Sequence, residues 1–323
     1  MSASRSGAPV KDRRPTRRGT ASKPAHKVKR FSTTDKVVLT LMVVGPLALE
    51  AVLIWFPTIL SVGLSFTRWN GLGDLSTIES AGWANYDYVF TDYPPFWPAV
   101  VHNVIWLVFL GAIATPLGIL FAVLLDKKIR FSRIYQSIFF LPVMLSLALI
   151  GIIWQLIYSG DNGLINSALG INGTHHAINF FGDKSINLWA ALIAQTWRHA
   201  GYVMILYLAG LKGIDPTLKE AAALDGASFW QTFRQVVFPA MKPINTIVIV
   251  ITIIEALRAF DLVYIINGGT NGLELLSALV VQNLLGEGQD LGVGSAIAVV
   301  LLIVSLVPIV FYLVKTFRKD AES

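Results

Sequence analysis

Six long stretches of the sequence are apolar and almost free of charged side chains. Each is about 18 residues or longer, the length that a helix needs to cross the hydrocarbon core of a bilayer. The six stretches are 37–66, 100–125, 134–158, 188–211, 244–266 and 293–314. We therefore predict an all-α integral membrane protein with six transmembrane helices, because only helices and closed barrels satisfy their backbone hydrogen bonds in lipid.

The composition excludes an ordinary soluble protein. Of the 323 residues, 54% are apolar and 14% are charged, whereas soluble domains carry about 25% charged residues. Six buried helices in a soluble chain of this length would leave too little polar chain to cover them. The chain has no cysteine, which excludes disulfides and thiolate metal sites.

The positive charges predict the orientation in the membrane, since Lys and Arg near span ends are retained in the cytoplasm. The segments rich in these residues are 1–36, 126–133, 212–243 and 315–323. The alternate segments between the spans hold only Arg68 and Lys184. Both termini are therefore expected in the cytoplasm.

The ends of the chain are expected to be tails around a membrane domain at 35–318. Residues 1–34 are basic and poor in large apolar side chains, a composition typical of disorder, and we expect a cytoplasmic tail that can lie on anionic lipid. Residues 319–323 form a short C-terminal tail. The twin Arg13 and Arg14 do not indicate a cleaved export signal, because the apolar run begins too late and is too long.

Outside the expected spans, the cytoplasmic segment 212–243 has strong helix signals. Asp215 is a good N-cap and Pro216 suits a first helical position, so a short helix is predicted through 217–222. Gly226 is expected to end it.

A second short helix follows within the same segment. Ser228 and Gln231 have the spacing of a capping box, and Pro239 is expected to close this helix. We call the two helices of 212–243 the elbow. They predict a surface that docks in a groove of another protein. The alternative is an amphipathic segment lying on the membrane.

The elbow sequence resembles the EAA loop of ABC importer permeases. That pattern is EAA, three residues, Gly, nine residues, Ile, one residue and Leu-Pro. The matching positions are Glu220, Ala221, Ala222, Gly226, Val236, Phe238 and Pro239, with Asp225 directly before the glycine. The spacing is intact, and Val236 and Phe238 preserve the apolar character of Ile and Leu.

Further stretches resemble the carbohydrate-importer branch of this family, in particular the first permease of maltose-type and glycerol-phosphate-type pairs. The stretches are FSRIYQSIFFLPVMLS, GIIWQLIYSGDNGLIN and FDLVYIINGGTNG. Thr270 stands where the family usually has proline after two glycines. The resemblance covers most of 37–315 and implies a type I ABC importer permease fold.

The resemblance also implies partners. A second, related permease, two cytoplasmic ATPase subunits and an extracytoplasmic sugar-binding protein would complete the transporter, with no nucleic acid involved and the complex in a prokaryotic cytoplasmic membrane. The EAA loop would sit in a cleft of an ATPase, where Glu220 pairs with basic or amide groups and Gly226 permits the backbone reversal. Alternatively, Glu220 is a solvated helix-face charge.

The chain itself is not expected to be an enzyme or to hold a cofactor. It contains no GxxxxGK[ST] phosphate loop, so ATP and magnesium are expected in the partner ATPase.

Charged residues inside the fifth stretch predict a polar pathway or a paired interior, because buried charges in membranes are costly. Glu255, Arg258 and Asp261 are three residues apart, which places them along one helix face within reach of one another. They can neutralise one another while offering donors and acceptors to a polyol. Asp261, nearest the outer end, alternatively belongs to a gate.

The fourth stretch adds aromatic and polar residues to the same candidate pathway. They are Trp197, Arg198, His199 and Tyr202, with Thr252 one turn before Glu255. In the sugar permeases that the chain resembles, the cavity is lined from these two helices. An aromatic ring and polar side chains suit a sugar. The alternative is a salt-bridge cluster that only joins helices.

A different class of transporter is the leading alternative for the whole chain. An ion-coupled secondary transporter would use Glu255, Arg258 and Asp261 as its coupling site, but the sequence shows neither an internal repeat nor paired Gly/Pro-broken segments. A membrane-embedded enzyme would need paired Asp or His ligands at span ends. The adjacent His175 and His176 lack further ligands at suitable spacing.

Overall fold

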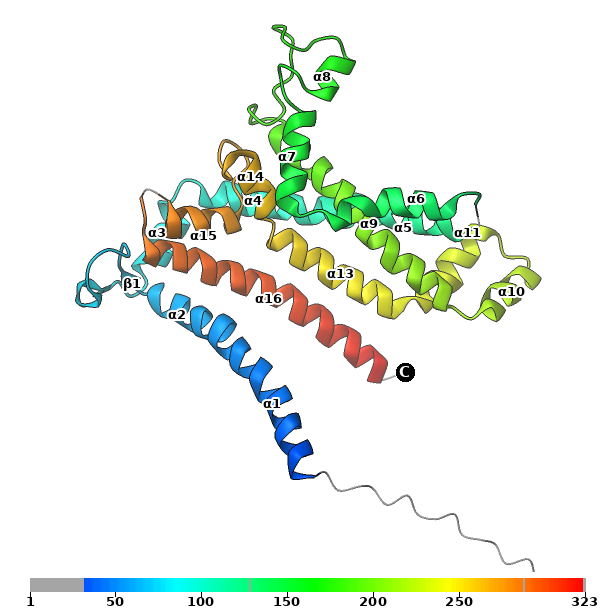
Figure 1. Cartoon of the computed structure of the whole chain (residues 1–323), viewed down its shortest axis with the longest axis horizontal. Coiled ribbons are helices and arrows are strands. Elements are labelled where there is room, and N and C mark those ends of the chain that lie inside the picture. Colours follow the sequence, from blue (N-terminus) through cyan, green and yellow to red (C-terminus); the bar gives the residue numbers. More distant parts are fainter. Residues whose placement is uncertain (1–31, 128, 287, 322–323) are drawn as a thin grey trace, which may run out of the picture. The chain divides into compact units, whose positions relative to one another are not determined.

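Figure 1 shows a computed structural model of the chain, which describes residues 32–127, 129–286 and 288–321. The chain divides into two units, Met1–Trp55 and Phe56–Ser323. Helices dominate both units, as predicted.

The described part of the first unit is one apolar helical segment. It comprises α1 (Thr33–Glu50) and a π-helical turn (Ala51–Trp55). The Ser32 amide donates to the Asp35 carboxylate at 2.9 Å and caps the helix. No side chain of α1 is buried, which fits a helix that meets lipid. The predicted tail 1–34 lies mostly outside the described residues, and its last two residues already belong to α1.

The second unit contains the remaining helices and one small sheet. They are α2 (Phe56–Leu64), β1 (Thr67–Arg68), β2 (Glu79–Ser80), α3 (Ala84–Thr91), α4 (Phe96–Phe109), α5 (Thr115–Asp126), α6 (Ser132–Phe140), α7 (Leu147–Ile157), α8 (Leu164–Ala168), α9 (Asn187–Gly213), α10 (Pro216–Leu224), α11 (Phe229–Thr232), α12 (Phe238–Ala240), α13 (Lys242–Leu257), α14 (Asp261–Asn267), α15 (Leu276–Leu285) and α16 (Leu291–Ala321). The two strands pair antiparallel. Since α16 reaches Ala321, the expected C-terminal tail 319–323 is wrong for its first three residues.

Three continuous helical stretches of the described chain are long and apolar enough to cross a membrane. They are Thr33–Leu64, Phe96–Asp126 and Leu291–Tyr312, and they correspond to the predicted spans 37–66, 100–125 and 293–314. The helix α9 matches the predicted span 188–211 in extent but is not among the three, and it carries Arg198 and His199 near its middle. The count of six spans stays a prediction.

The prediction of one helix over 134–158 is wrong. This stretch forms α6, a 3₁₀ turn (Leu141–Met144) and α7, and the two parts are bent by 104°. Pro142 has no amide hydrogen to continue α6. The Ser146 hydroxyl then accepts the Leu149 amide at 3.2 Å and starts α7. If the bent pair is one span, the described chain has up to four.

The prediction of one helix over 244–266 is also wrong, because α13 ends at Leu257 and α14 begins at Asp261. Side chains from other helices bind the carbonyls that the break leaves free. Asn103 of α4 donates to the Ala256 carbonyl at 3.3 Å, and the Ser277 hydroxyl donates to the Ala259 carbonyl. Glu255, Arg258 and Asp261 therefore do not share one helix face.

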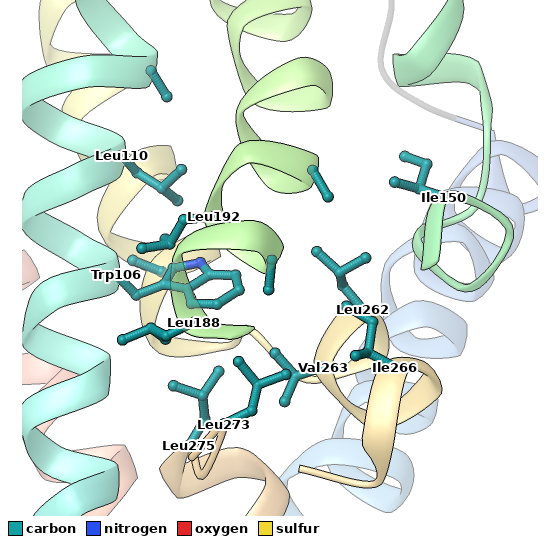
Figure 2. Close-up of a cluster of buried hydrophobic side chains, with 14 residues drawn as sticks. Trp106, Leu110, Ile150, Leu188, Leu192, Leu262, Val263, Ile266, Leu273 and Leu275 are labelled. Atoms are coloured by element: carbon teal, nitrogen blue, oxygen red, sulfur yellow. The ribbon is translucent and has the colours of Figure 1, made fainter. Parts of the chain in front are cut away.

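The buried core around this break joins α4, α7, α9 and α14. Trp106 of α4 is fully buried and points toward Leu188 and Leu192 of α9 (Figure 2). Ile150 of α7 and Leu262 of α14 belong to the same cluster. The helices α4, α7, α9 and α14 are thus held together by residues that lie far apart in the sequence.

The close approach of α5 to α9 depends on Gly118. A Cβ there would lie 2.6 Å from the Ala200 carbonyl oxygen and 2.7 Å from the Val203 Cβ. We predict that Gly118→Val destabilises the protein by about 1–3 kcal/mol, the usual range for overpacking. Gly111→Val is the matched control, because a Cβ at Gly111 meets nothing within 4 Å. Thermal unfolding in detergent measures both, and equal midpoints would contradict this packing.

Candidate functional site

The centre of the second unit contains a charged cluster between α9 and α13. The Glu255 carboxylate accepts from Arg198 Nη1 at 3.0 Å through Oε1 and from His199 Nδ1 at 2.8 Å through Oε2. The His199 side chain is fully buried, whereas those of Arg198 and Glu255 are 20% and 22% exposed. Two consecutive residues of α9 thus bind both oxygens of one carboxylate, which fixes α13 against α9.

The other nitrogen of His199 extends this cluster to a third helix. His199 Nε2 lies 3.2 Å from the Thr115 hydroxyl of α5 and 3.3 Å from the Thr252 hydroxyl of α13. Because an ionised carboxylate only accepts, the Nδ1 atom carries the proton that faces Glu255. The Thr252 hydroxyl donates to the Val248 carbonyl at 2.7 Å and lies 3.4 Å from the Thr115 hydroxyl.

A cavity of about 220 Å³ lies directly beside this cluster. Its polar lining includes Arg198, Glu255, Arg258 and Asp261. Arg258 is the C-cap of α13 and Asp261 is the first residue of α14, so the break itself brings their side chains to the cavity. The three predicted residues of the fifth stretch and Arg198 of the fourth stretch therefore line one cavity, although they come from three helices.

The predicted mutual neutralisation of these three residues is wrong. Glu255 pairs with Arg198 and His199 instead, and no ion pair among the described residues joins it to Arg258 or Asp261. The break after Leu257 turns the chain away from the helical spacing on which the prediction relied. Arg258 and Asp261 also line a second cavity of about 480 Å³, against α15 and α16.

The other predicted pathway residues lie apart from the cavity beside Glu255. Thr252 is buried and reaches Glu255 only through His199. Trp197 is 36% exposed, and its ring packs edge to face on the Trp154 ring with 6.0 Å between the ring centroids. Neither Trp197 nor Tyr202 is among the residues that line the cavity.

Sequence reasoning missed Thr115 and Ser277, and it gave no partner for Asn103. Each is a single small polar residue whose partner lies far away in the sequence, so no spacing within its own helix indicates its role. Asn103 also accepts the Leu276 amide at 2.9 Å through its carbonyl oxygen. The side chain therefore joins α4, α13 and α15.

The cluster generates a prediction for Glu255. Glu255→Gln keeps the side-chain size but turns an amide donor toward His199 or Arg198, so we expect a loss of about 1–3 kcal/mol. Asp261→Asn is the matched control, because Asp261 lines the same cavity and makes no ion pair with a described residue. Thermal unfolding compares the two variants. An equal midpoint for both would contradict the role of Glu255 in joining the helices.

The first helix of the elbow, α10, has the predicted ends. The Asp215 carboxylate accepts the Thr217 amide at 2.9 Å, and this hydrogen bond lowers the pKa of Asp215. At the other end, Gly226 has a φ of +76°. The Ala227 amide bonds to the Ala222 carbonyl at 3.0 Å and the Gly226 amide to the Ala223 carbonyl at 3.1 Å. This pair of bonds is the Schellman motif, which favours glycine.

The second helix of the elbow also begins as predicted. The Ser228 amide donates to the Gln231 side chain at 2.8 Å, and the Gln231 amide donates to the Ser228 hydroxyl at 3.4 Å. A π-helical turn (Phe233–Val237) and α12 follow. The prediction that Pro239 closes the helix is wrong, because the helical run continues to Ala240. Pro239 comes just after the π-helical turn, which interrupts the α-helical hydrogen-bond ladder at this point.

The elbow is attached to the end of α5 and presents an exposed face. Lys219 Nζ lies 3.2 Å from Asp126 Oδ2, and Lys127 Nζ lies 3.8 Å from the centroid of the Phe229 ring. Ala222 packs inward at 7% exposure, whereas Leu224 is 89% exposed.

The motif positions Glu220, Ala221 and Asp225 lie on the exposed side of α10 and of its C-cap. Glu220 makes no ion pair with any residue that the structure describes. An exposed leucine beside an unpaired carboxylate is suited to a protein partner.

Comparisons with known proteins identify the class. The fold resembles a chain of a bacterial ABC transporter involved in the import of the acidic polysaccharide alginate, with a TM-score of 0.73 over 88% of this chain and 96% of that chain at 19% identity. The shared fold is that of a type I ABC importer permease.

Sequence comparisons identify the family. Residues 114–322 match the model of the binding-protein-dependent transport system inner membrane component. The chain is 32% identical to the osmoprotective compounds uptake permease protein GgtC of Synechocystis sp., over 85% of this chain and 97% of GgtC. It is also 32% identical to the xylose/arabinose import permease protein XacH of Haloferax volcanii, over 85% and 86%. The chain therefore belongs to this family of ABC transporter permeases, and it is a multi-pass membrane subunit of a binding-protein-dependent importer.

Proposed function

We propose that this chain forms half of the pathway by which an ATP-driven importer carries a sugar or sugar-like solute across the cytoplasmic membrane. The observation that carries the proposal is the elbow, a capped and exposed pair of helices in a chain whose family works in binding-protein-dependent import. The second half of the pathway comes from a related permease. An extracytoplasmic binding protein delivers the solute.

The elbow is the proposed docking site for a cytoplasmic ATPase. Glu220 and Leu224 are exposed on α10, where a carboxylate and an apolar side chain can fill a cleft of the partner. Two ATPase subunits supply ATP and magnesium, since this chain has no phosphate loop. The Lys219–Asp126 pair links α10 to the end of α5, and α9 leads into α10 along the chain. Closure of the ATPase would therefore move α5 and α9 together.

The proposed solute pathway passes the cavity beside Glu255. Arg258 and Asp261 offer donors and acceptors there without an ion pair to any described residue. Sugar hydroxyls both donate and accept, so they can bind to both groups. The likeness to a xylose/arabinose import permease supports a sugar as the solute. Trp197, Tyr202 and Thr252 lie on α9 and α13, the helices that carry Arg198 and Glu255, but they do not line this cavity.

The proposed topology has six spans, with both termini and the elbow in the cytoplasm. The support is the asymmetry of Lys and Arg between alternate segments. In this topology α6 with α7, α9, and α13 with α14 supply the third, fourth and fifth spans. Two of these three are interrupted, which is tolerated where the backbone is enclosed by protein or lines a cavity.

Coupling through the elbow is tested at Gly226. Gly226→Val places a branched side chain in the left-handed region, with a strain of about 1–2 kcal/mol that displaces the end of α10. In the reconstituted transporter we expect sugar uptake to fall roughly tenfold, while the ATPase subunits continue to hydrolyse ATP. Gly213→Val is the matched control, because Gly213 ends α9 and has open space around it. Normal uptake by a membrane-inserted Gly226→Val variant would refute the coupling role.

A further inference from the structure

A further cavity of the second unit lies away from the elbow. It has a volume of about 670 Å³ and is lined by β1 and the loop after it, by α3 and by the start of α16. Figure 1 shows β1 and α3 at one end of this unit and α10 and α11 at the other. In the proposed topology this end faces the outside, and none of the pathway residues discussed above lines the cavity.

The walls of this cavity are held rigidly together. The Leu291 amide donates to the Trp69 carbonyl at 2.9 Å. The Asn85 amide group donates to the carbonyls of Ser65 and Thr67 at 2.9 and 2.8 Å. A Cβ at Gly292 would lie 2.2 Å from the Thr67 carbonyl oxygen, so only glycine permits this approach. The loop is therefore fixed against α16, so ligand binding would cost little conformational entropy of the loop.

Two aromatic side chains line the cavity. The Trp69 indole donates to the Leu72 carbonyl at 3.3 Å, which fixes the orientation of its ring. Tyr88 of α3 is 43% exposed and lines the same cavity. Aromatic faces bind the apolar C–H faces of sugar rings, and the tyrosine hydroxyl adds a polar group beside them.

The polar groups of the cavity have unused hydrogen-bonding capacity. Arg68 and Asp290 both line it, yet neither forms an ion pair with a residue that the structure describes. Asp290 Oδ1 accepts the Val293 amide at 3.0 Å, and Oδ2 has no partner in the described chain. Asn70 Oδ1 accepts the Leu72 amide at 3.0 Å, and the side-chain amide hydrogens of Asn70 have no acceptor among the described residues. The cavity thus offers donors, an acceptor and aromatic faces together.

We propose that this cavity is a binding site for a neutral saccharide, separate from the cavity beside Glu255. A sugar hydroxyl donates to Asp290 and accepts from Arg68, so one neutral molecule satisfies both opposite charges. A carboxylate sugar would suit Arg68 but be repelled by Asp290. The choice of a free saccharide rests on the proposed import function, whereas the ligand chemistry rests on the cavity residues alone.

The test is saccharide binding to the full chain in phospholipid nanodiscs that contain no sugar detergent. Maltotriose is the probe, and saturation-transfer NMR gives its dissociation constant, expected at about 1–10 mM. We expect Arg68→Gln and Asp290→Asn each to weaken binding roughly tenfold, because each removes a charge-assisted hydrogen bond. The amide oxygen introduced by Asp290→Asn can still accept the Val293 amide. Lys184→Gln is the matched control and leaves binding unchanged, since Lys184 is exposed and lies outside the cavity lining.

Several results would overturn the site. One is the absence of saturable binding to wild type up to about 50 mM, and another is undiminished binding to both charge variants. A third is weakening of binding by Arg258→Gln alone, which would assign the sugar to the cavity beside Glu255. Tighter binding of trigalacturonate than of maltotriose would contradict the neutral class. Binding only of a glucosyl lipid in the nanodisc would contradict a free saccharide. If the two charge variants associate more weakly with the binding protein while their maltotriose binding is unchanged, the cavity is a contact for that protein instead.

This test is independent of the test of import. If uptake needs ATP but the wild-type chain binds no maltotriose at this end, the proposed site is refuted and the proposed function is not. If uptake needs no ATPase but Arg68→Gln and Asp290→Asn weaken maltotriose binding as predicted, the proposed function is refuted and the proposed site is not.

Discussion

The Glu255 carboxylate, bound by Arg198 at 3.0 Å and by His199 at 2.8 Å, is the interaction on which the centre of the second unit depends. A charge at the middle of a membrane helix costs about 2.5–3.5 kcal/mol on insertion scales, so this carboxylate needs its partners. His199 then carries the connection to Thr115 of α5. Three helices of the proposed pathway are thereby fixed at one imidazole, next to the point where α13 ends.

In the proposed pathway, the break after α13 provides a cavity for the solute next to this fixed point. Asn103 and Ser277 bind the carbonyls that the break leaves free, and Arg258 and Asp261 reach the adjoining cavity. The elbow leads directly into α13, because Met241 alone separates α12 from Lys242. In the proposed mechanism, movement of the elbow by the ATPase is transmitted along α13 to the cavity beside Glu255.

The sequence was informative where structure is local and uninformative where it depends on distant partners. The caps at Asp215 and Ser228 and the reversal at Gly226 follow from residues within one helical turn, and all three are confirmed. The break at 258–260 contains neither proline nor glycine, and its stabilising side chains come from α4 and α15. The ion-pair partners of Glu255 lie more than fifty residues away in the sequence. The interrupted helices also weaken the argument that the chain lacks the broken helices of a secondary transporter, but family membership favours the importer.

ATP-dependent uptake by the complete transporter tests the central claim most directly. The chain, its partner permease, the binding protein and the ATPase would be reconstituted in liposomes, with the nucleotide site of the ATPase either intact or disabled. The account predicts that labelled sugar enters only with the intact ATPase and that uptake otherwise falls to the level of empty liposomes. Uptake that persists with the disabled ATPase and follows an imposed ion gradient would contradict it.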